Sequence, residues 1–293
     1  MLTSIAAIML TASAALTQTP APRDTFTLWQ LPQQSPTQMM SYVIQTVNEQ
    51  VIVIDGGNEA ETGYLRGFLG ALGDHVTLWI ISHPHSDHVA ALNAILDDPG
   101  TLRVDEIAAA LPEVEWLKEH CPGETATVTH VERLRAGAER CGIPLRELAL
   151  GETFEIDGIH AKVLGVCNPE IRANGVNNSS MVWRMWDDKK SVLFTGDVGA
   201  EASEKVLNGP YRDELKADYL QMAHHGQAGA TEAFYVAAEP RFCLWPTPDW
   251  LWDNDNGGGK GSGPWQTLDV RAWIDKLDVE RHYILKDGLH RID

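Results

Sequence analysis

Three histidines and an aspartate lie within six residues of one another at positions 83–88, which read His-Pro-His-Ser-Asp-His. The cluster follows a short apolar run of strand length, residues 77–81, and precedes an apolar helical stretch, residues 89–96. The helical stretch is stopped by Asp98-Pro99-Gly100. We therefore expect the cluster to lie in a loop between a strand and a helix, where catalytic groups are commonly carried.

The residue types in this cluster are those that bind divalent metal ions. Imidazole nitrogens and carboxylate oxygens are the donors that zinc and similar ions prefer. Alternate residues leaving a strand can face one side, so His83 and His85 can bind one ion, whereas Asp87 and His88 can reach a second. A histidine-rich surface loop is the alternative, but a position directly after an apolar strand argues against it. The cluster predicts one or two divalent ions, Zn²⁺ in the first place and Mn²⁺ as the alternative.

Further polar clusters also end runs of strand length. They are Asp55-Gly56-Gly57 after residues 51–54, Gly196-Asp197 after residues 191–194, and His224-His225-Gly226 after residues 218–222. Strands interspersed with helices and hairpins predict an α+β fold with two mixed sheets covered by helices. No linker divides residues 25–293, so we expect one domain there.

The N-terminal stretch has the pattern of a signal peptide. Residues 2–16 are apolar and small, and Ala12-Ser13-Ala14 supplies an A-x-A pattern, so we expect a signal peptide over residues 1–20 and export to the periplasm or beyond the cell. The stretch carries no Lys or Arg before its apolar run, so the alternative is the frayed N-terminus of a cytoplasmic protein. Elsewhere no stretch approaches the roughly 18 apolar residues of a membrane span, so we expect a soluble mature chain.

Charge and cysteine spacing exclude several classes. The formal net charge is −18, and no Lys/Arg run inverts it locally, which disfavours nucleic acid and favours a small-molecule substrate. None of the four cysteines forms a C-x-x-C pair, so neither a zinc knuckle nor a thioredoxin-type site is indicated. Export would permit a disulfide, for which Cys121 and Cys141 are the candidate pair; four unpaired thiols are the alternative.

The sequence resembles the metallo-beta-lactamase superfamily, whose signature H-x-H-x-D-H is matched in full at residues 83–88. The other three clusters match in the family's order, and the resemblance spans roughly residues 27–290. Residues 177–180, 194–197 and 224–226 look most like the beta-lactamase-like domain of competence DNA-uptake proteins. The resemblance implies an αββα sandwich, with two mixed sheets face to face and helices on the outer faces, and a metal-dependent hydrolase.

The resemblance also implies roles for the matched residues. His83 and His85 would bind the first ion, Asp87, His88 and His225 the second, and Asp197 would bridge the two, with Asp55 orienting a ligand and His224 as the alternative to His225. Asp87 would also be the catalytic base that accepts a proton from the attacking water.

One departure from the family pattern concerns the first ion. The superfamily usually supplies a third histidine from a loop before the bridging aspartate, and here that loop, residues 174–179, reads Asn-Gly-Val-Asn-Asn-Ser. We expect the first ion to be bound weakly, to be absent, or to be completed by the amide oxygen of Asn177 or Asn178.

Three functions follow. A metal ion lowers the pKa of bound water to roughly 7 and makes hydroxide available; no G-x-S-x-G, Walker A or G-x-G-x-x-G motif offers a competing chemistry. Hydrolysis of a phosphodiester is favoured by the resemblance. Hydrolysis of an ester, lactone or amide is the alternative, with the tryptophans between Trp245 and Trp265 as an apolar wall and the glycine-rich loop at 254–263 as a lid or a solvated insertion. A non-catalytic metal-binding module is the third.

Overall fold

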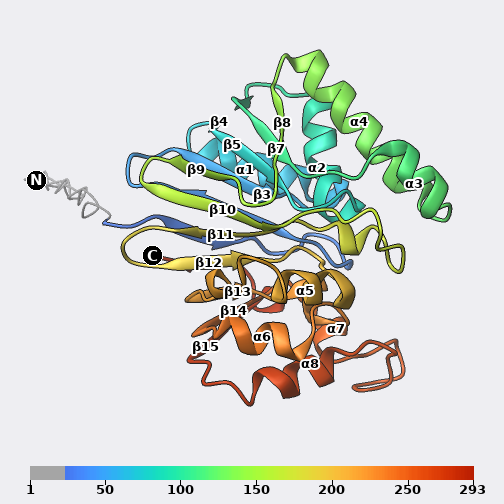
Figure 1. Ribbon diagram of the computed structural model, residues 1–293. Helices are drawn as coiled ribbons and strands as arrows, with labels where there is room; N and C mark the ends of the chain where they lie inside the picture. Colours follow the sequence, from blue (N-terminus) through green and yellow to red (C-terminus); the bar gives the residue numbers. More distant parts are fainter. Residues whose placement is uncertain (1–23) are drawn as a thin grey trace, which may run out of the picture.

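The structure, a computed structural model, describes residues 24–293 and contains two seven-stranded sheets packed face to face (Figure 1). The signal peptide expected over residues 1–20 lies outside the described residues. In spatial order the first sheet contains β16 (His290–Ile292), β1 (Thr27–Gln30), β2 (Ser41–Gln45), β3 (Val51–Asp55), β5 (Leu78–Ile81), β7 (Ile107–Ala109) and β8 (Leu145–Glu147).

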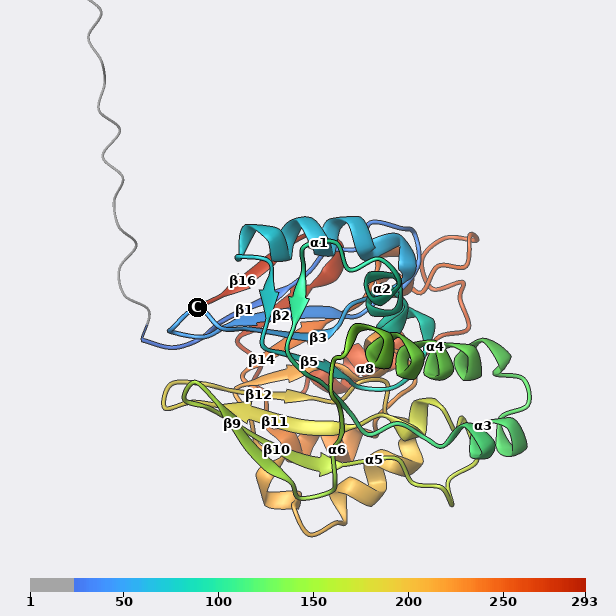
Figure 2. The same ribbon diagram turned by 90° about the horizontal axis from the view of Figure 1, so that it is seen from above.

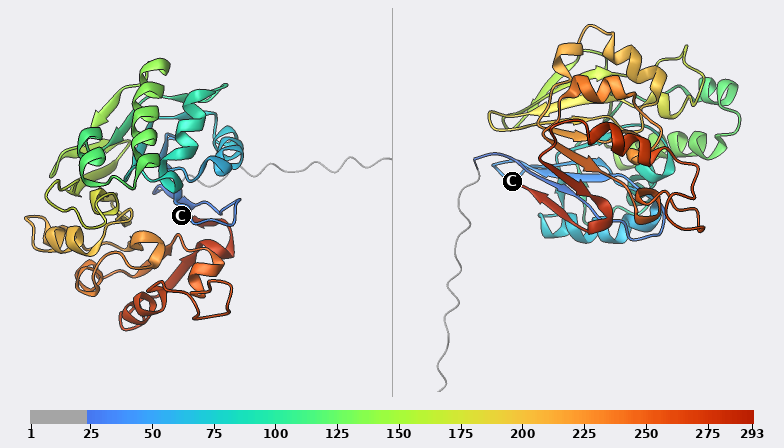
Figure 3. Two further views of the ribbon diagram at one scale, coloured as in Figure 1. Left: turned by 90° about the vertical axis from the view of Figure 1, so that its right-hand side faces the viewer. Right: turned by 90° about the horizontal axis from the view of Figure 1, so that it is seen from below.

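The second sheet contains β15 (Arg281–Ile284), β14 (Phe242–Trp245), β13 (Tyr219–Gln221), β12 (Ser191–Phe194), β11 (Val182–Trp186), β10 (Ile159–Gly165) and β9 (Thr153–Ile156). A separate pair is formed by β4 (His75–Val76) and β6 (Arg103–Val104). The C-terminal strand β16 pairs with β1, so both ends of the described chain lie in the first sheet (Figure 3).

Helices cover the outer face of each sheet, which confirms the expected αββα sandwich (Figures 1 and 2). Over the first sheet lie α1 (Thr62–Ala71), α2 (Ser86–Asp97) and α4 (Thr125–Cys141), with α3 (Val114–His120) beside them. Over the second lie α5 (Ala200–Leu207), α6 (Glu232–Ala238), α7 (Asp249–Trp252) and α8 (Thr267–Ile274). Short 3-10 turns are η1 (Glu59–Glu61), η2 (Asn177–Ser179), η3 (Arg212–Glu214), η4 (Ala223–Gly226) and η5 (Leu285–Asp287).

Successive side chains of the central strands point alternately to the two faces of the sheet, so one apolar run contributes to two apolar layers. In β3, Ile52 and Ile54 enter the core between the sheets, whereas Val51 and Val53 pack under the helices of the first sheet. Successive side chains of a strand point to opposite faces, so a strand buried on both faces is apolar throughout. This burial fixes where each strand ends and therefore where the polar clusters begin.

Both sheets change from antiparallel to parallel pairing near their centres. Strands β3, β5, β7 and β8 are parallel neighbours in the first sheet, and β12, β13, β14 and β15 in the second. In such sheets, ligands bind beside the carboxyl ends of the strands. The predicted clusters follow β3, β5, β12 and β13.

The structure corrects the expected position of part of the histidine cluster. Helix α2 begins at Ser86, so Asp87 and His88 lie in its first turn and not in the loop. His85 keeps an extended backbone, and its carbonyl accepts the N–H groups of His88 and Val89 at 3.1 Å. The sequence pattern had placed the helix start at Val89, the first apolar residue, because polar residues of a first helical turn add nothing to the apolar periodicity.

The candidate pair Cys121–Cys141 is not formed: all four cysteines are free, which is the alternative that the sequence left open. Cys121 precedes α4, and Cys141 is its last residue. A helix of 17 residues is about 25 Å long, far more than the roughly 7 Å between Cα atoms that a disulfide tolerates. In residues 24–293 no helix combines the length and apolarity needed to cross a bilayer.

Candidate metal centre

The loops after four strands meet at one edge of the sandwich. Asp55 ends β3, His83 follows β5, Asp197 follows β12, and His225 lies in η4 after β13. Asp87 and His88 reach the same place from the first turn of α2. The two sheets therefore contribute side chains from opposite sides to one buried cluster.

One donor group consists of Asp87, His88, Asp197 and His225, all buried. Nε2 of His225 lies 3.1 Å from Oδ2 of Asp87 and 3.3 Å from Oδ2 of Asp197. Nε2 of His88 lies 3.3 Å from Oδ1 of Asp197. These are the residues that the sequence proposes for the second ion.

The other donor group consists of His83, His85 and Asp197. Nε2 of His83 lies 3.0 Å from Nδ1 of His85 and 3.9 Å from Oδ2 of Asp197. Asp197 thus belongs to both groups, in the position of the bridging carboxylate that the resemblance implies. In each group the donor atoms lie within 4.8 Å of one another.

The donor atoms fit a metal ion better than they fit one another. Nε2 of His88, Nε2 of His225 and Oδ1 of Asp197 are buried without a well-formed hydrogen bond, and leaving such atoms unpaired costs about 1–3 kcal/mol each. Two atoms that each lie about 2.0–2.1 Å from a tetrahedral zinc ion are about 3.3 Å apart, close to the spacings of 3.1 and 3.3 Å in the first-described group.

Asp55 holds His88 from beneath the cluster. Its Oδ2 lies 2.8 Å from Nδ1 of His88, and its two oxygens accept the backbone N–H and the hydroxyl of Ser82 at 2.8 and 2.9 Å. Nδ1 is therefore the nitrogen that keeps its proton when Nε2, which faces Asp197, gives up its own to bind an ion. A carboxylate behind a ligand histidine fixes the ring in this way in many metal sites.

The backbone bends sharply at His224 and His225, so the two imidazole rings point to different neighbours. His224 and His225 have φ of 50° and 56°, in the left-handed region that residues with a Cβ avoid. His225 turns Nε2 into the cluster while its Nδ1 lies 3.0 Å from the carbonyl oxygen of Pro246. His224 instead lies 3.2 Å from Nδ2 of Asn177 through Nε2, and its Nδ1 contacts the carbonyl of Ala228. The donor groups include His225 and not His224.

Asn177 and Asn178, in the loop that lacks the family's usual histidine, have different hydrogen-bond partners. Asn178 has both amide atoms engaged: Oδ1 accepts the N–H of Ala202, and Nδ2 donates to the carbonyl of Ala173 and to Glu201. Asn178 therefore anchors the loop to α5. Asn177 is also buried, but its Oδ1 has no hydrogen-bond partner. The structure thus leaves an acceptor at Asn177 and none at Asn178.

Two histidines of the cluster, His225 and His88, have raised pKa values. Burial would lower the pKa of His225, but Asp197 and Asp87 beside it raise that pKa to about 9. Burial also opposes the charge of His88, yet Asp197 and Asp55 raise its pKa well above the usual range. His83 lacks such close support, and burial holds its pKa well below the usual range.

Several polar contacts around the cluster were not predicted from the sequence, and two of them involve residues, Gln38 and Glu124, that lie outside every motif. Gln38 donates through Nε2 to Oδ2 of Asp87 at 3.1 Å, and Glu124 lies 3.6 Å from Nε2 of His85. Ser180 accepts the N–H of Asp197 at 3.0 Å. Gly196 permits this approach, because a Cβ there would meet Ser180 and Ser82 at 3.0 Å. A motif scan finds none of these contacts, since each joins segments that are distant along the chain.

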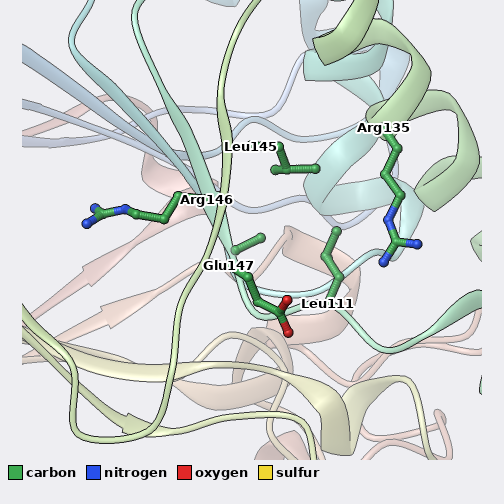
Figure 4. A pocket seen from close by; sticks show the side chains of 6 residues that line it. Leu111, Arg135, Leu145, Arg146 and Glu147 are labelled. Carbon is green, nitrogen blue, oxygen red and sulfur yellow. The ribbon is translucent and has the colours of Figure 1, made fainter.

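A cavity of about 190 Å³ lies apart from these residues, between β7, β8 and α4 (Figure 4). Leu111 and Leu145 form its apolar lining, and Arg135 and Arg146 flank it. Arg146 lies 2.9 Å from Glu106, and Arg135 lies 3.7 Å from Glu113, so both cations already have acidic partners. We assign it no function.

The chain belongs to the metallo-beta-lactamase superfamily, because the family model "Metallo-beta-lactamase superfamily" matches residues 35–235. ComE operon protein 3 of Bacillus subtilis (strain 168) is 31% identical over 114 residues, which cover 39% of this chain and 14% of that protein. The match therefore concerns a small part of the relative's length.

Solved structures share the fold at low sequence identity. The metallo-beta-lactamase fold protein YhfI of Bacillus subtilis is 13% identical, with a TM-score of 0.56 over 92% of this chain and 100% of that one. The diiron beta-hydroxylase CmlA of Streptomyces venezuelae is 13% identical, with a TM-score of 0.53 over 92% and 54%. Yeast PDE1 is 12% identical, with a TM-score of 0.52 over 90% and 98%. These likenesses concern the fold alone.

Proposed function

We propose that this member of the metallo-beta-lactamase superfamily is a metal-dependent hydrolase, in which the two donor groups that share Asp197 would hold up to two divalent ions, Zn²⁺ in the first place. The observation that carries the proposal is the shared carboxylate: Asp197 belongs to both donor groups, and its buried Oδ1 has no well-formed hydrogen bond. A divalent ion bound here would lower the pKa of a water molecule to roughly 7 and offset negative charge on the substrate.

Asp87 is the residue we propose as the general base. Its side chain is 13% exposed, whereas those of Asp55 and Asp197 are 0% and 1% exposed. Of these three carboxylates, only Asp87 can therefore take a proton from a group that enters from solvent. Although burial opposes ionisation, His225 and His88 hold the pKa of Asp87 below its usual range, so the carboxylate is ionised at neutral pH, as a base requires.

Asn177 is the residue we propose as the remaining protein ligand of the first ion. Nδ1 of His224 contacts a carbonyl, so that nitrogen carries the ring proton and Nε2 accepts from Nδ2 of Asn177. The amide orientation is thereby set, with the unpartnered Oδ1 on the other side. An amide oxygen suits manganese better than an imidazole does and holds zinc less firmly, so we expect the first ion to be the weaker one.

The substrate class that we propose is a small phosphodiester. Pairs of divalent ions that share a ligand suit phosphoryl chemistry, because one ion can hold the attacking oxygen and the other the leaving oxygen. The resemblance of residues 177–180, 194–197 and 224–226 to the beta-lactamase-like domain of competence DNA-uptake proteins favours this class. The net charge of −18 disfavours long polyanions, so a small molecule is the better fit.

A carboxylic ester or lactone is the second candidate, favoured by one apolar feature near Gln38. The rings of Trp250 and Trp265 are 4.8 Å apart and half-buried, and Nε1 of Trp250 donates to the carbonyl of Pro36, two residues from Gln38. Trp245, by contrast, is in the core under the second sheet. Trp250 and Trp265 are therefore the tryptophans that could form the expected apolar wall.

Metal analysis with parallel assays separates these candidates. The purified protein, loaded with Zn²⁺ or Mn²⁺, is assayed on bis(p-nitrophenyl) phosphate, p-nitrophenyl acetate and a lactone panel, with and without EDTA. We expect EDTA-sensitive turnover of the phosphodiester. Turnover confined to the acetate or the lactones would select the second candidate, and bound metal without turnover of any substrate would indicate a non-catalytic module.

A further inference from the structure

Gln38 reaches the proposed base from outside the ligand set. Its Nε2 donates to Oδ2 of Asp87 at 3.1 Å. The residue lies in segment 31–40, which joins β1 to β2, and it is half-buried. Any group that fixes the Asp87 carboxylate also fixes a proposed metal ligand and the proposed base.

A second amide sets the orientation of the first. Nε2 of Gln227 donates to Oε1 of Gln38 at 3.2 Å. Because the ionised carboxylate of Asp87 can only accept, the NH₂ group of Gln38 must face Asp87 and its oxygen must face Gln227. Gln227 is 7% exposed, lies two residues after His225, and donates its backbone N–H to the carbonyl of His224 at 3.0 Å. The amides of Gln38 and Gln227 therefore connect the segment after β13, in the second sheet, to Asp87, in the helix that covers the first sheet.

The backbone around Gln38 is held independently of its side chain. The N–H of Met40 donates to the carbonyl of Asp87 at 3.0 Å, and the side chain of Asn58 donates to the carbonyl of Gln38 at 2.8 Å. Farther along the segment, the N–H of Gln34 donates to the buried carboxylate of Glu61 at 2.6 Å. A change confined to the Gln38 side chain should therefore leave the segment in place.

The amide contact differs from the histidine contact in how it responds to a metal ion. Nε2 of His225 also lies 3.1 Å from Oδ2 of Asp87. That nitrogen has no well-formed hydrogen bond and is itself a proposed metal donor, so it is not available to hold Asp87 once an ion binds. The amide of Gln38 neither titrates nor competes for the ion at neutral pH. Its hydrogen bond can therefore hold Asp87 both before and after metal binding.

We propose that Gln38, oriented by Gln227, is a positioning residue that holds Oδ2 of Asp87 while the second ion binds and while Asp87 accepts a proton. The inference rests on the proposed function, because it assumes that the Asp87 group binds a metal ion. Hydrogen-bond partners of metal ligands of this kind typically contribute 10- to 100-fold to metal affinity or activity, so the contribution should be about that large.

The test compares three substitutions by titrating the metal-free proteins with Zn²⁺ against a chromophoric chelator. Gln38→Met keeps the chain length and removes the donor, and Gln227→Met removes only its orienting partner. Gln34→Met is the matched control on the same segment, because the Gln34 side chain bonds only to the nearby carbonyl of Pro32. We expect about a 10- to 100-fold rise in the Kd of the tighter ion for Gln38→Met, a smaller rise for Gln227→Met, and no change for Gln34→Met.

The visible absorption of bound Co²⁺ supplies a readout of ligand geometry that does not depend on turnover. We expect its bands to shift in Gln38→Met and to stay unchanged in Gln34→Met. Equal Zn²⁺ affinity and equal Co²⁺ spectra in the two variants would overturn the positioning role while leaving the proposed function intact. A wild-type protein that binds neither ion would overturn both, so the two failures are distinguishable.

Discussion

Nδ1 of His88 lies 2.8 Å from Oδ2 of Asp55, and this contact directs Nε2 of the same ring toward Asp197. Asp55 adopts φ of 58° at the end of β3 and is fully buried, so the strand end is bent to present the carboxylate to the ring. Two buried aspartates thus address opposite nitrogens of one imidazole. Nδ1 is hydrogen-bonded to Asp55, and Nε2 is the nitrogen that can bind a metal ion.

Asp55→Asn should weaken metal binding although Asp55 touches no ion. An amide keeps only one acceptor oxygen, so it cannot accept from both the Ser82 backbone N–H and Nδ1 of His88, which bond to different oxygens of Asp55. Either Nδ1 loses its partner or the proton moves to Nε2, where it blocks metal binding. We predict about a 10- to 100-fold increase in the Zn²⁺ Kd, measured by chelator competition. Asp188→Asn, an exposed site with the same change of charge, is the control. Equal affinity in both variants would contradict this role.

Asn177→His should strengthen the first ion site. The substitution replaces the amide oxygen by an imidazole, which zinc prefers, and we predict an affinity gain for the weaker ion on the order of tenfold, or about 1.4 kcal/mol. Isothermal titration with Zn²⁺ measures the binding of the tighter and of the weaker ion separately. Asn178→Ala is the comparison, because it removes the anchor to α5 and should lower stability without strengthening the binding of either ion. No gain in Asn177→His would place Asn177 outside the coordination sphere.

Metal affinity should rise with pH across the neutral range. In the metal-free protein the pKa of His225 is about 9 and that of His88 is well above its usual range, so both rings are protonated at pH 7 and must release protons to bind. The Kd should therefore fall by about tenfold per pH unit for each proton released and become pH-independent above about pH 9 for His225. Titration calorimetry in two buffers of different ionisation enthalpy counts the protons. Zero protons released at pH 7 would be inconsistent with this charge state.

Gly226→Ala should destabilise the metal-free fold more than Gly158→Ala. Both glycines have similar φ, 79° and 81°, but a Cβ at Gly226 would lie 2.5 Å from the ring of Trp245, whereas one at Gly158 meets nothing within 4 Å. The shared backbone cost is about 1–2 kcal/mol, and the clash adds about 1–3 kcal/mol at Gly226. Urea unfolding of both metal-free variants measures the difference. Equal free energies of unfolding would mean that η4 and Trp245 move apart at no cost.

The sandwich was predictable because its central strands are buried on both faces. The run Val-Ile-Val-Ile at residues 51–54 cannot face water on either side, and the polar residue that ends such a run marks the edge of the sheet. The same reasoning applies to residues 78–81 and 191–194, so the clusters at Asp55, His83 and Asp197 could be located from sequence. The order in which the strands pair was not predicted, because periodicity shows which faces of a strand are buried and not which strands are its neighbours.

The contacts that orient the cluster could not be predicted in the same way. Gln38 and Asp87 are 49 positions apart and Gln227 and Gln38 are 189 apart, and the segment that carries Gln38 has neither helical nor strand periodicity. Which asparagine stays unpartnered depended on where α5 lies, because Ala202 and Glu201 engage Asn178. The sequence could not decide between the candidate disulfide and four unpaired thiols for a related reason, since the boundaries of α4 set the separation of Cys121 and Cys141.

The metal content of Asp197→Ala tests the central claim most directly, because Asp197 belongs to both donor groups. Wild-type protein and the variant are equilibrated with the same limiting Zn²⁺ and analysed by plasma mass spectrometry, with circular dichroism to confirm folding. We predict one to two equivalents of zinc in the wild type and less than about a tenth as much in folded Asp197→Ala, because even the loss of a ligand's hydrogen-bond partner typically costs about 10- to 100-fold in metal affinity. Equal zinc content in the two proteins would contradict a metal centre built around Asp197.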